Sequence, residues 1–218
     1  AVPHPGNEQQ AQWLQIRQFK PDWVILRGWG VMNPTALKAA AKIGFPREKI
    51  VGVWWSGAEE DTIPAGDAAK GFIAAGFNVA GQNYPVVQDI LKSVYGKGKG
   101  NMEDKSRVGS VYYNRGVVHG IITVEAIRKA QEKYGKGKSI TGEQMRWGIE
   151  NLNIDAAMLK KLGAEGFMPA LKMSCANHEG SGLVKFQQWD GKQWKVITDW
   201  IESAKALARG MVEEPEAK

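Results

Sequence analysis

The chain has 218 residues, of which 43% are hydrophobic and 24% charged, a composition that is typical of globular proteins and excludes a disordered or collagen-like chain. The net charge of +6 attracts polyanions in general, but many lysines lie in two glycine-rich runs, at 97–99 and 136–138, just past expected helix or loop ends. Because lysine near a helix C-terminus complements the helix dipole, these runs need no polyanion, and we expect no nucleic-acid partner.

The first third of the chain predicts alternating helices and strands. We expect helices over 8–19 and 33–43, and strands over 23–26, 49–54 and 72–77. We expect Asn7 to cap the first helix, Pro34 to occupy the first turn of the second, and Gly44 to end it. This alternation is typical of a parallel α/β layer.

Two consecutive predicted strands end in tryptophans. Trp29 follows the first strand and precedes Gly30, whereas Trp54 and Trp55 end the second and precede Ser56. Because neighbouring parallel strands point their carboxyl ends to the same edge, we expect these loops to wall one aromatic ligand pocket. Adjacent residues of a strand face opposite ways, so only one of Trp54 and Trp55 should line it. The alternatives are that Trp29 caps its own sheet edge and that the clustering is chance.

The rest of the chain continues the mixture of helices and strands. We expect helices over 85–94, 111–134, 141–150, 155–162 and 200–211, an extended apolar segment over 167–173, and a hairpin of 183–189 with 193–198. Thr141 and Gln144 form an expected capping box. The run from 135 to 139 does not fit a phosphate-binding loop, because Glu132 stands where the pattern needs glycine. We therefore expect no cofactor.

No group of residues forms a complete catalytic or metal site. Cys175 is the single cysteine, and we interpret it as structural because its neighbour His178 completes no triad. The acidic run 59–61 is interpreted as a solvated helix start, with a metal or acid–base pair as the alternative. His119 has no partner at helical spacing, and His178-Glu179 lacks a second histidine. We expect no metal and no enzymatic activity.

Several motifs resemble one protein family. Residues 21–28 match an "x-D-x-V-x-x-x-G" strand that is followed by an aromatic loop, and residues 65–71 match the more specific "A-G-D-A-A-x-G" segment. A strand–Asp-Gly–strand pattern stands at Asp190. From Asn7 to Phe77, and more weakly to about residue 200, the chain resembles the periplasmic substrate-binding proteins of branched-chain amino acid-type ABC transporters.

The resemblance implies the α/β type I periplasmic binding fold, with two lobes of parallel sheets flanked by helices. Residues 1–75 would form the main part of the C-terminal lobe, 76–182 the remainder of the N-terminal lobe, and 183–218 the return to the C-terminal lobe. The chain would begin in the middle of the fold and be an incomplete C-terminal portion. The missing N-terminal part, with its Ser/Thr loops for an amino acid head group, would come from a separate chain or segment, or the chain is a fragment.

The resemblance also implies a periplasmic, non-enzymatic receptor that closes on a small molecule and docks on the membrane permease of an ABC importer. It adds Tyr112 or Asn114, at a helix start, as cleft residues, with ordinary core and surface positions as the alternative. Trp54 stands near where amino-acid binders of the family place a carboxylate for the ammonium group of the ligand. Because an ammonium group would lose its counter-charge here, we predict an aromatic or apolar carboxylate ligand. A branched-chain amino acid-like ligand stays open as the alternative. Arg27 is either a bidentate clamp for that acid or a surface or inter-lobe residue.

Two other functions stay open. One is a cytosolic ligand-sensing regulatory domain with the same fold, which the N-terminal sequence of the precursor would separate from an exported receptor. The other is an enzyme on a related α/β scaffold, for which the candidates Cys175 with His178 and the acids 59–61 each lack a partner.

Overall fold

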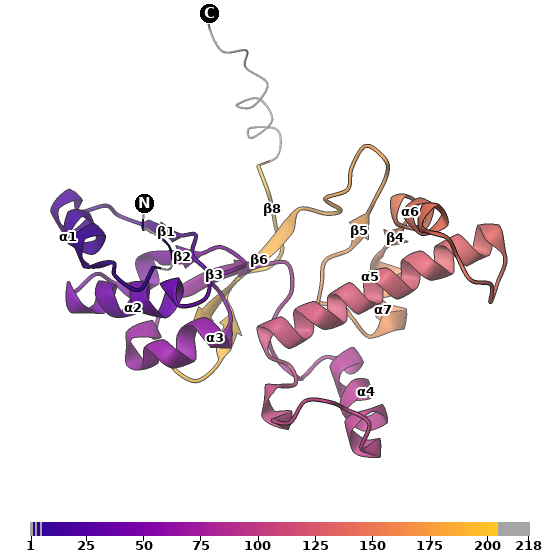
Figure 1. The fold of residues 1–218 in the computed structure, drawn as a ribbon, viewed down its shortest axis with the longest axis horizontal. Helices are drawn as coiled ribbons and strands as arrows, with labels where there is room; N and C mark the ends of the chain where they lie inside the picture. The colour runs from indigo at the N-terminus through magenta and orange to yellow at the C-terminus, as the bar shows by residue number, and fades with distance from the viewer. Residues whose placement is uncertain (1, 3, 5, 205–218) are drawn as a thin grey trace, which may run out of the picture.

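Two hydrophobic cores organise residues 2, 4 and 6–204, which the computed structural model describes (Figure 1). The first core contains Trp13, Leu37, Ile50 and Phe72 and belongs to a sheet and its helices. The second is built from residues between 84 and 173, and Phe167 is its largest fully buried side chain. We refer to residues 6–76 with 183–202 as the first lobe and to residues 84–173 as the second lobe.

The sheet of the first lobe mixes parallel and antiparallel strands. The order is β1 (Val24–Leu26), β2 (Ile50–Gly52), β3 (Ile73–Gly76), β6 (Leu183–Trp189) and β7 (Trp194–Val196), with β8 (Ile201–Glu202) also paired to β6. The first three strands are parallel and the others antiparallel. The predicted parallel layer and the C-terminal hairpin are confirmed.

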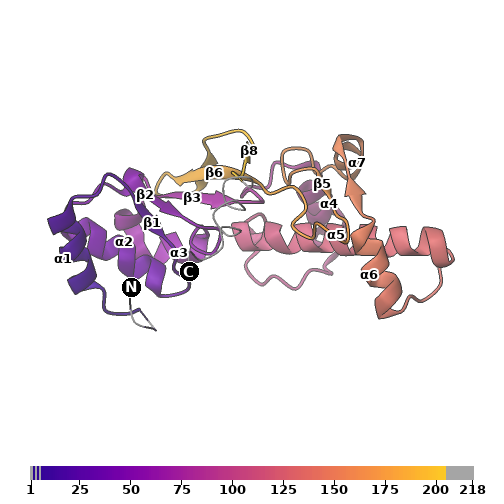
Figure 2. The ribbon, with the colours of Figure 1, turned by 90° about the horizontal axis from the view of Figure 1, so that it is seen from above.

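Helices cover one side of this sheet (Figure 2). They are α1 (Gln10–Phe19), α2 (Met32–Lys42) and α3 (Glu59–Thr62). The 3-10 turn η1 (Arg47–Lys49) connects α2 to β2, and η2 (Ile63–Ala69) connects α3 to β3. Helix α2 packs closely because its small apolar residues Ala36 and Ala40 flank Leu37, and all three are fully buried. Gly44, with φ of +73°, follows α2 as expected.

The second lobe is mainly helical. It contains α4 (Pro85–Ser93), η3 (Tyr95–Lys97), η4 (Lys105–Arg107), α5 (Val111–Tyr134), α6 (Gly142–Glu150), α7 (Ala156–Leu162) and the antiparallel pair β4 (Asn153–Ile154) and β5 (Leu171–Lys172). Helix α5 runs from the lobe junction along the whole second lobe (Figure 2). The predicted capping box of α6 is confirmed, since the Gln144 amide donates to Thr141 Oγ1 and the Thr141 amide donates to Gln144 Oε1. None of the described helices is long and apolar enough to cross a membrane.

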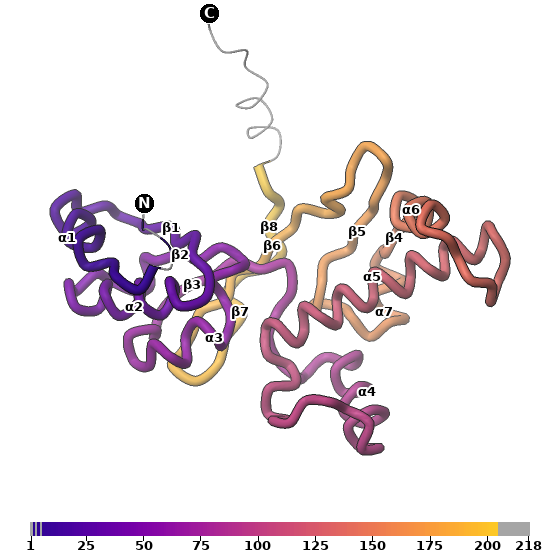
Figure 3. The backbone as a smooth tube through the Cα atoms, in the orientation of Figure 1, coloured from indigo at the N-terminus to yellow at the C-terminus, as the bar shows by residue number. Residues whose placement is uncertain are grey.

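The chain passes between the lobes twice within the described residues (Figure 3). It leaves the first lobe after β3, which ends at Gly76, and returns at β6, which begins at Leu183. The first passage is tied to the sheet by Gln187 of β6, whose buried side chain accepts a hydrogen bond of 2.9 Å from the Ala80 amide. The parallel strands β1 to β3 therefore point their carboxyl ends toward the second lobe.

Three expectations about helix ends and the acidic run are wrong. Gln9, not Asn7, is the N-cap of α1, because the Gln9 side chain anchors the helix start to the carbonyls of Gly6 and Met32. Where a helix over 200–211 was expected, Ile201 and Glu202 form strand β8, which pairs with β6. Residues 205–211 of that expected helix lie outside the described part. The acids do begin α3, but Asp61 is only 1% exposed because it pairs with first-lobe donors and is not solvated.

Cys175 also differs from the expected structural thiol, because it is free and exposed in the loop that follows β5. Its neighbour His178 places Nε2 3.4 Å from Glu150 Oε1. The loop is polar and turn-rich, so it supplies no apolar surroundings in which a thiol would be buried.

Candidate functional site

The three tryptophans predicted from strand ends lie together at the sheet edge that faces the second lobe. The rings of Trp29 and Trp55 stack with centroids 6.1 Å apart and an interplanar angle of 29°. Trp54 and Trp55 are 5.4 Å apart at 59°. The two loops thus form one continuous aromatic surface, which we call the tryptophan cluster (Trp29, Trp54 and Trp55).

The tryptophan cluster is open to solvent. Trp29 is 57% exposed, Trp54 43% and Trp55 45%. Strand β2 ends at Gly52, so Trp54 and Trp55 stand in a turn and the strict alternation of a strand does not separate them. Large exposed aromatic surface of this kind is uncommon on a folded protein and is typical of contact surfaces, which makes the tryptophan cluster a candidate site.

Buried polar groups beneath the tryptophan cluster fix its two loops. Ser56 is fully buried, and its Oγ lies within hydrogen-bond distance of the carbonyls of Leu26 and Gly28 while it accepts from the Gly28 amide. Asn33 Nδ2 donates to the carbonyl of Trp55 at 3.2 Å and to Asp61 Oδ1 at 2.7 Å. Ser56 therefore holds the loops of β1 and β2 together, and its hydroxyl is occupied by backbone groups.

Asp61 is a buried acid near this edge, and its surroundings shift its pKa. Burial raises its pKa to about 6, although the hydrogen bonds from Asn33 and the Ala58 amide lower it. At neutral pH the carboxylate is charged and committed to those two donors. The neighbouring acids are also committed, since Glu59 accepts from the Val111 amide at 2.9 Å and Glu60 pairs with Arg107.

An apolar groove of about 600 Å³ lies between the two lobes, next to Trp54. Its walls come from both lobes and from the segments that join them: Trp54, Phe77, Val118, His119, Ile122, Met168, Pro169, Leu171, Met173, 178–184 and Ser203. His119 stacks on Phe77 with centroids 6.3 Å apart. Trp54 thus belongs to both the groove and the tryptophan cluster.

The start of helix α5 meets the first lobe through Arg115, a residue that the sequence did not single out. Its Nη2 donates to the carbonyl of Trp54 at 2.8 Å, and its Nε donates to Asn78 Oδ1 at 3.2 Å. The guanidinium carbon lies 5.0 Å from the ring centre of Phe77 and 5.1 Å from that of Tyr112. The only hint in the sequence is an arginine within an aromatic helix start, Tyr112-Tyr113-Asn114-Arg115.

The other predicted site residues have different surroundings. Arg27 is exposed and has no hydrogen bond or ion pair within the described part of the chain. Gly30 has φ of +51°, which lets the loop turn into α2. Tyr112 is 38% exposed beside Arg115, and burial first, then the charge of Asp61, raises its pKa to about 12. Asn114 is fully buried and donates to the carbonyls of Val79, Gly81 and Gly109.

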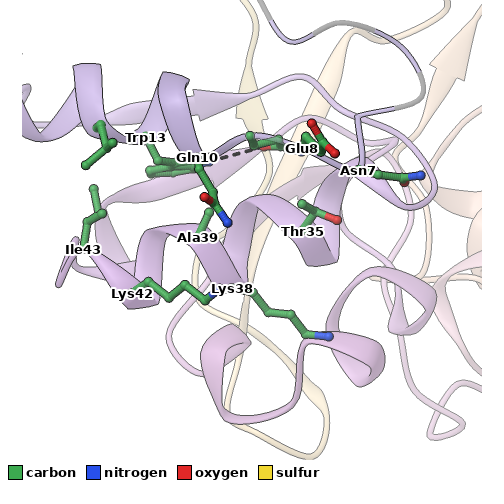
Figure 4. Close-up of a pocket in the computed structure, with 11 residues that line it drawn as sticks. Asn7, Glu8, Gln10, Trp13, Thr35, Lys38, Ala39, Lys42 and Ile43 are labelled. Carbon is green, nitrogen blue, oxygen red and sulfur yellow. Dashed lines mark hydrogen bonds between the residues drawn. The ribbon is translucent and has the colours of Figure 1, made fainter.

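A second hollow of about 600 Å³ lies on the outer side of the first lobe, between α1 and α2 (Figure 4). Trp13 and Ile43 lie on one wall, and Lys38 and Lys42 extend along α2. It stands at the end of the molecule away from the second lobe (Figure 1). No described group of three or more His, Cys, Asp or Glu residues there or elsewhere could hold a metal ion.

Comparisons with known proteins identify the family. A family model described as periplasmic binding protein matches residues 1–193. No curated protein matches the chain. Among solved structures, one described as an ABC transporter permease from the Pseudomonas fluorescens group is 48% identical, with a TM-score of 0.92 over 98% of this chain and 51% of its own.

More distant structures share the fold. A branched-chain amino acid ABC transporter protein from Thermus thermophilus with bound valine is 24% identical, with a TM-score of 0.70 over 92% of this chain and 51% of its own. A solute-binding protein from R. palustris in complex with benzoate is 16% identical, with a TM-score of 0.61 over 93% and 50%. This chain spans about half the length of each structure. It belongs to the periplasmic binding protein family and has the type I fold of its branched-chain amino acid-type members.

Proposed function

We propose that this chain is part of the solute-binding component of an ABC importer, which binds a small aromatic or apolar carboxylate between two lobes without chemical conversion. The single observation that carries the proposal is the exposed, stacked pair Trp29 and Trp55, which continues through Trp54 into the groove at the lobe junction. Binding sites for small molecules are concave and largely aromatic or apolar, as this region is.

The charges near the tryptophan cluster favour an acid over a free amino acid. Glu59, Glu60 and Asp61 are each occupied by a protein donor. The ammonium group of an amino acid would therefore find no free carboxylate among these three. An unpaired buried ion costs several kcal/mol, to order of magnitude. A branched-chain amino acid-like ligand is the alternative, and the Thermus thermophilus protein holds valine.

Family membership supports a placement in the cell and a lobe assignment. We propose a periplasmic protein that delivers its ligand to membrane permease subunits after hinge closure. We also propose that residues 1–75 and 183–218 belong to the C-terminal lobe of the family and residues 76–182 to the N-terminal lobe. Two separate hydrophobic cores support this division.

A further polypeptide segment should complete the first lobe. Strand β1 is an edge of the sheet, and Ile25, on the side of β1 away from the core residues Val24 and Leu26, is 75% exposed. Nearby Phe19 and Trp23 are 83% and 56% exposed. Because parallel strands are normally covered on both faces, we propose that the N-terminal part of the family, from the same protein or a separate chain, covers this surface.

The ligand class is tested with the protein produced from its complete reading frame. Thermal shifts are measured with aromatic acids and with branched-chain amino acids, on wild type and on Trp55→Ala. We expect stabilisation by at least one aromatic acid and a loss of that shift in Trp55→Ala. Stabilisation by branched-chain amino acids alone would reject the proposed ligand class, and no response to either group would reject the receptor function as stated.

A further inference from the structure

Arg115 has a cationic side chain whose partners are neutral. Its guanidinium donates to a backbone carbonyl and to an amide oxygen, those of Trp54 and Asn78. No carboxylate of the described residues lies within ion-pair distance of it. Of its five N–H donors, both on Nη1 and one on Nη2 have no acceptor in the described part of the chain.

The surroundings of Arg115 orient its guanidinium. Phe77 and Tyr112 each place a ring about 5 Å from the guanidinium carbon. Aromatic rings attract a guanidinium and restrict the directions in which it can turn. The hydrogen bonds to Trp54 and Asn78 further fix the plane of the guanidinium, because a planar group can make both bonds in few orientations. The side chain is therefore preorganised before any ligand arrives.

The same surroundings connect Arg115 to the proposed binding region. Trp54 and Phe77, both of which contact Arg115, also line the apolar groove between the lobes. Burial lowers the pKa of the Arg115 guanidinium, whereas Tyr112 and Asp61 raise it, so the cation is partly desolvated. Asp61 is already engaged by Asn33 and the Ala58 amide. A partly desolvated cation without an anionic partner favours an incoming anion.

We propose that Arg115 anchors the carboxylate of the ligand at the lobe junction, with the aromatic or apolar body of the ligand lying in the groove and against the tryptophan cluster. This inference rests on the proposed function and names the group that selects an acid. A guanidinium can hold both oxygens of a carboxylate through parallel N–H donors. Arg115 takes the role considered for Arg27, whose exposed side chain has no hydrogen bond or ion pair in the described part of the chain.

Pairs of acids and their amides test the anchor, because each pair differs in charge and hardly in shape. The probes are benzoate and benzamide, phenylacetate and phenylacetamide, and cinnamate and cinnamamide. Binding to the complete protein is measured by titration calorimetry for wild type, Arg115→Met, Arg115→Lys and Arg27→Met. The acid-over-amide preference is the readout, since loss of packing alone would weaken acid and amide together.

We expect wild type to prefer the acid of at least one pair, and Arg115→Met to reduce that preference at least about tenfold. Arg115→Lys keeps the positive charge but not the forked donors, so its acid-over-amide preference should fall several-fold. If Arg115→Met does not fold, Arg115→Lys is the variant that tests the anchor. Arg27→Met should match wild type. An unchanged preference in a folded Arg115 variant overturns the anchor and leaves the receptor function standing. If wild type binds no probe of any pair, the proposed ligand class and the anchor both fail.

Discussion

The clearest consequence of the structure concerns Asn114, because its buried side chain fastens the crossover segment to helix α5. Its Nδ2 donates to the carbonyls of Val79, Gly81 and Gly109 at 2.8, 3.0 and 3.2 Å. In Asn114→Ala the Val79 and Gly81 carbonyls lose this buried donor, whereas the Gly109 carbonyl keeps its hydrogen bond from the Gly81 amide. Each net hydrogen bond contributes about 1 kcal/mol, and the buried carbonyls and the small cavity add to the loss, so we expect a destabilisation of about 2–4 kcal/mol.

The loss is measured by urea unfolding of the complete protein, followed by circular dichroism. Asn101→Ala is the matched control, because Asn101 is exposed in a loop and makes no hydrogen bond in the described structure. It should change stability by less than about 0.5 kcal/mol.

A ligand role and a structural role for Asn114 give different results. If Asn114 acts through the crossover, Asn114→Ala unfolds more easily while the folded fraction binds aromatic acids with little change. If the variant is as stable as Asn101→Ala but binds its ligand at least tenfold more weakly, the structural reasoning is refuted.

Three further predictions concern pH, helix packing and the tryptophan cluster. Because the pKa of Asp61 is raised from 3.8 to about 6, the protonated side chain stabilises the fold below about pH 3.8, and this contribution is lost as pH rises through 6. The free energy of unfolding of wild type, measured from pH 4 to 7, should therefore fall by about 3 kcal/mol, and this fall should be absent in Asp61→Asn. Identical pH profiles for the two proteins would contradict the prediction. An added Cβ at Gly148 would overlap the Ala126 carbonyl oxygen, so Gly148→Ala should lower stability by about 1–3 kcal/mol, whereas Gly142→Ala, with open space around it, should not; equal Tm values for the two variants would refute the packing. Trp55→Ala should weaken an aromatic acid about tenfold by calorimetry, and an unchanged Kd would remove the tryptophan cluster from the binding site.

Elements with local causes could be predicted from the sequence. The β6–β7 hairpin depends on Asp190, whose Oδ1 accepts from the amides of Lys192 and Gln193 within the turn itself. The capping box of α6 and the glycine that ends α2 are equally local. Strand β8 could not be predicted in this way, because Ile201 pairs with Val184 and its helical pattern was overruled by that distant partner.

Some residues of the candidate site could likewise be predicted from the sequence, whereas others depend on distant partners. The meeting of Trp29 with Trp55 follows from strand order, which the sequence predicts. The role of Arg115 depends on Phe77 and Trp54, which are 38 and 61 positions away, and no spacing rule connects them. The burial of Asp61 depends on Asn33 in the same way, and so one acid of a run that suggests a solvated helix start is buried in the first lobe.

The central claim is that the tryptophan cluster and the adjoining groove hold a small acid at the lobe junction. The most direct measurement is a crystal structure of the complete protein grown with the aromatic acid that stabilises it most. We predict electron density for that acid against Trp54, within the groove between the lobes. Density in the hollow between α1 and α2 instead, or crystals in which the groove is filled by protein side chains, would contradict the claim.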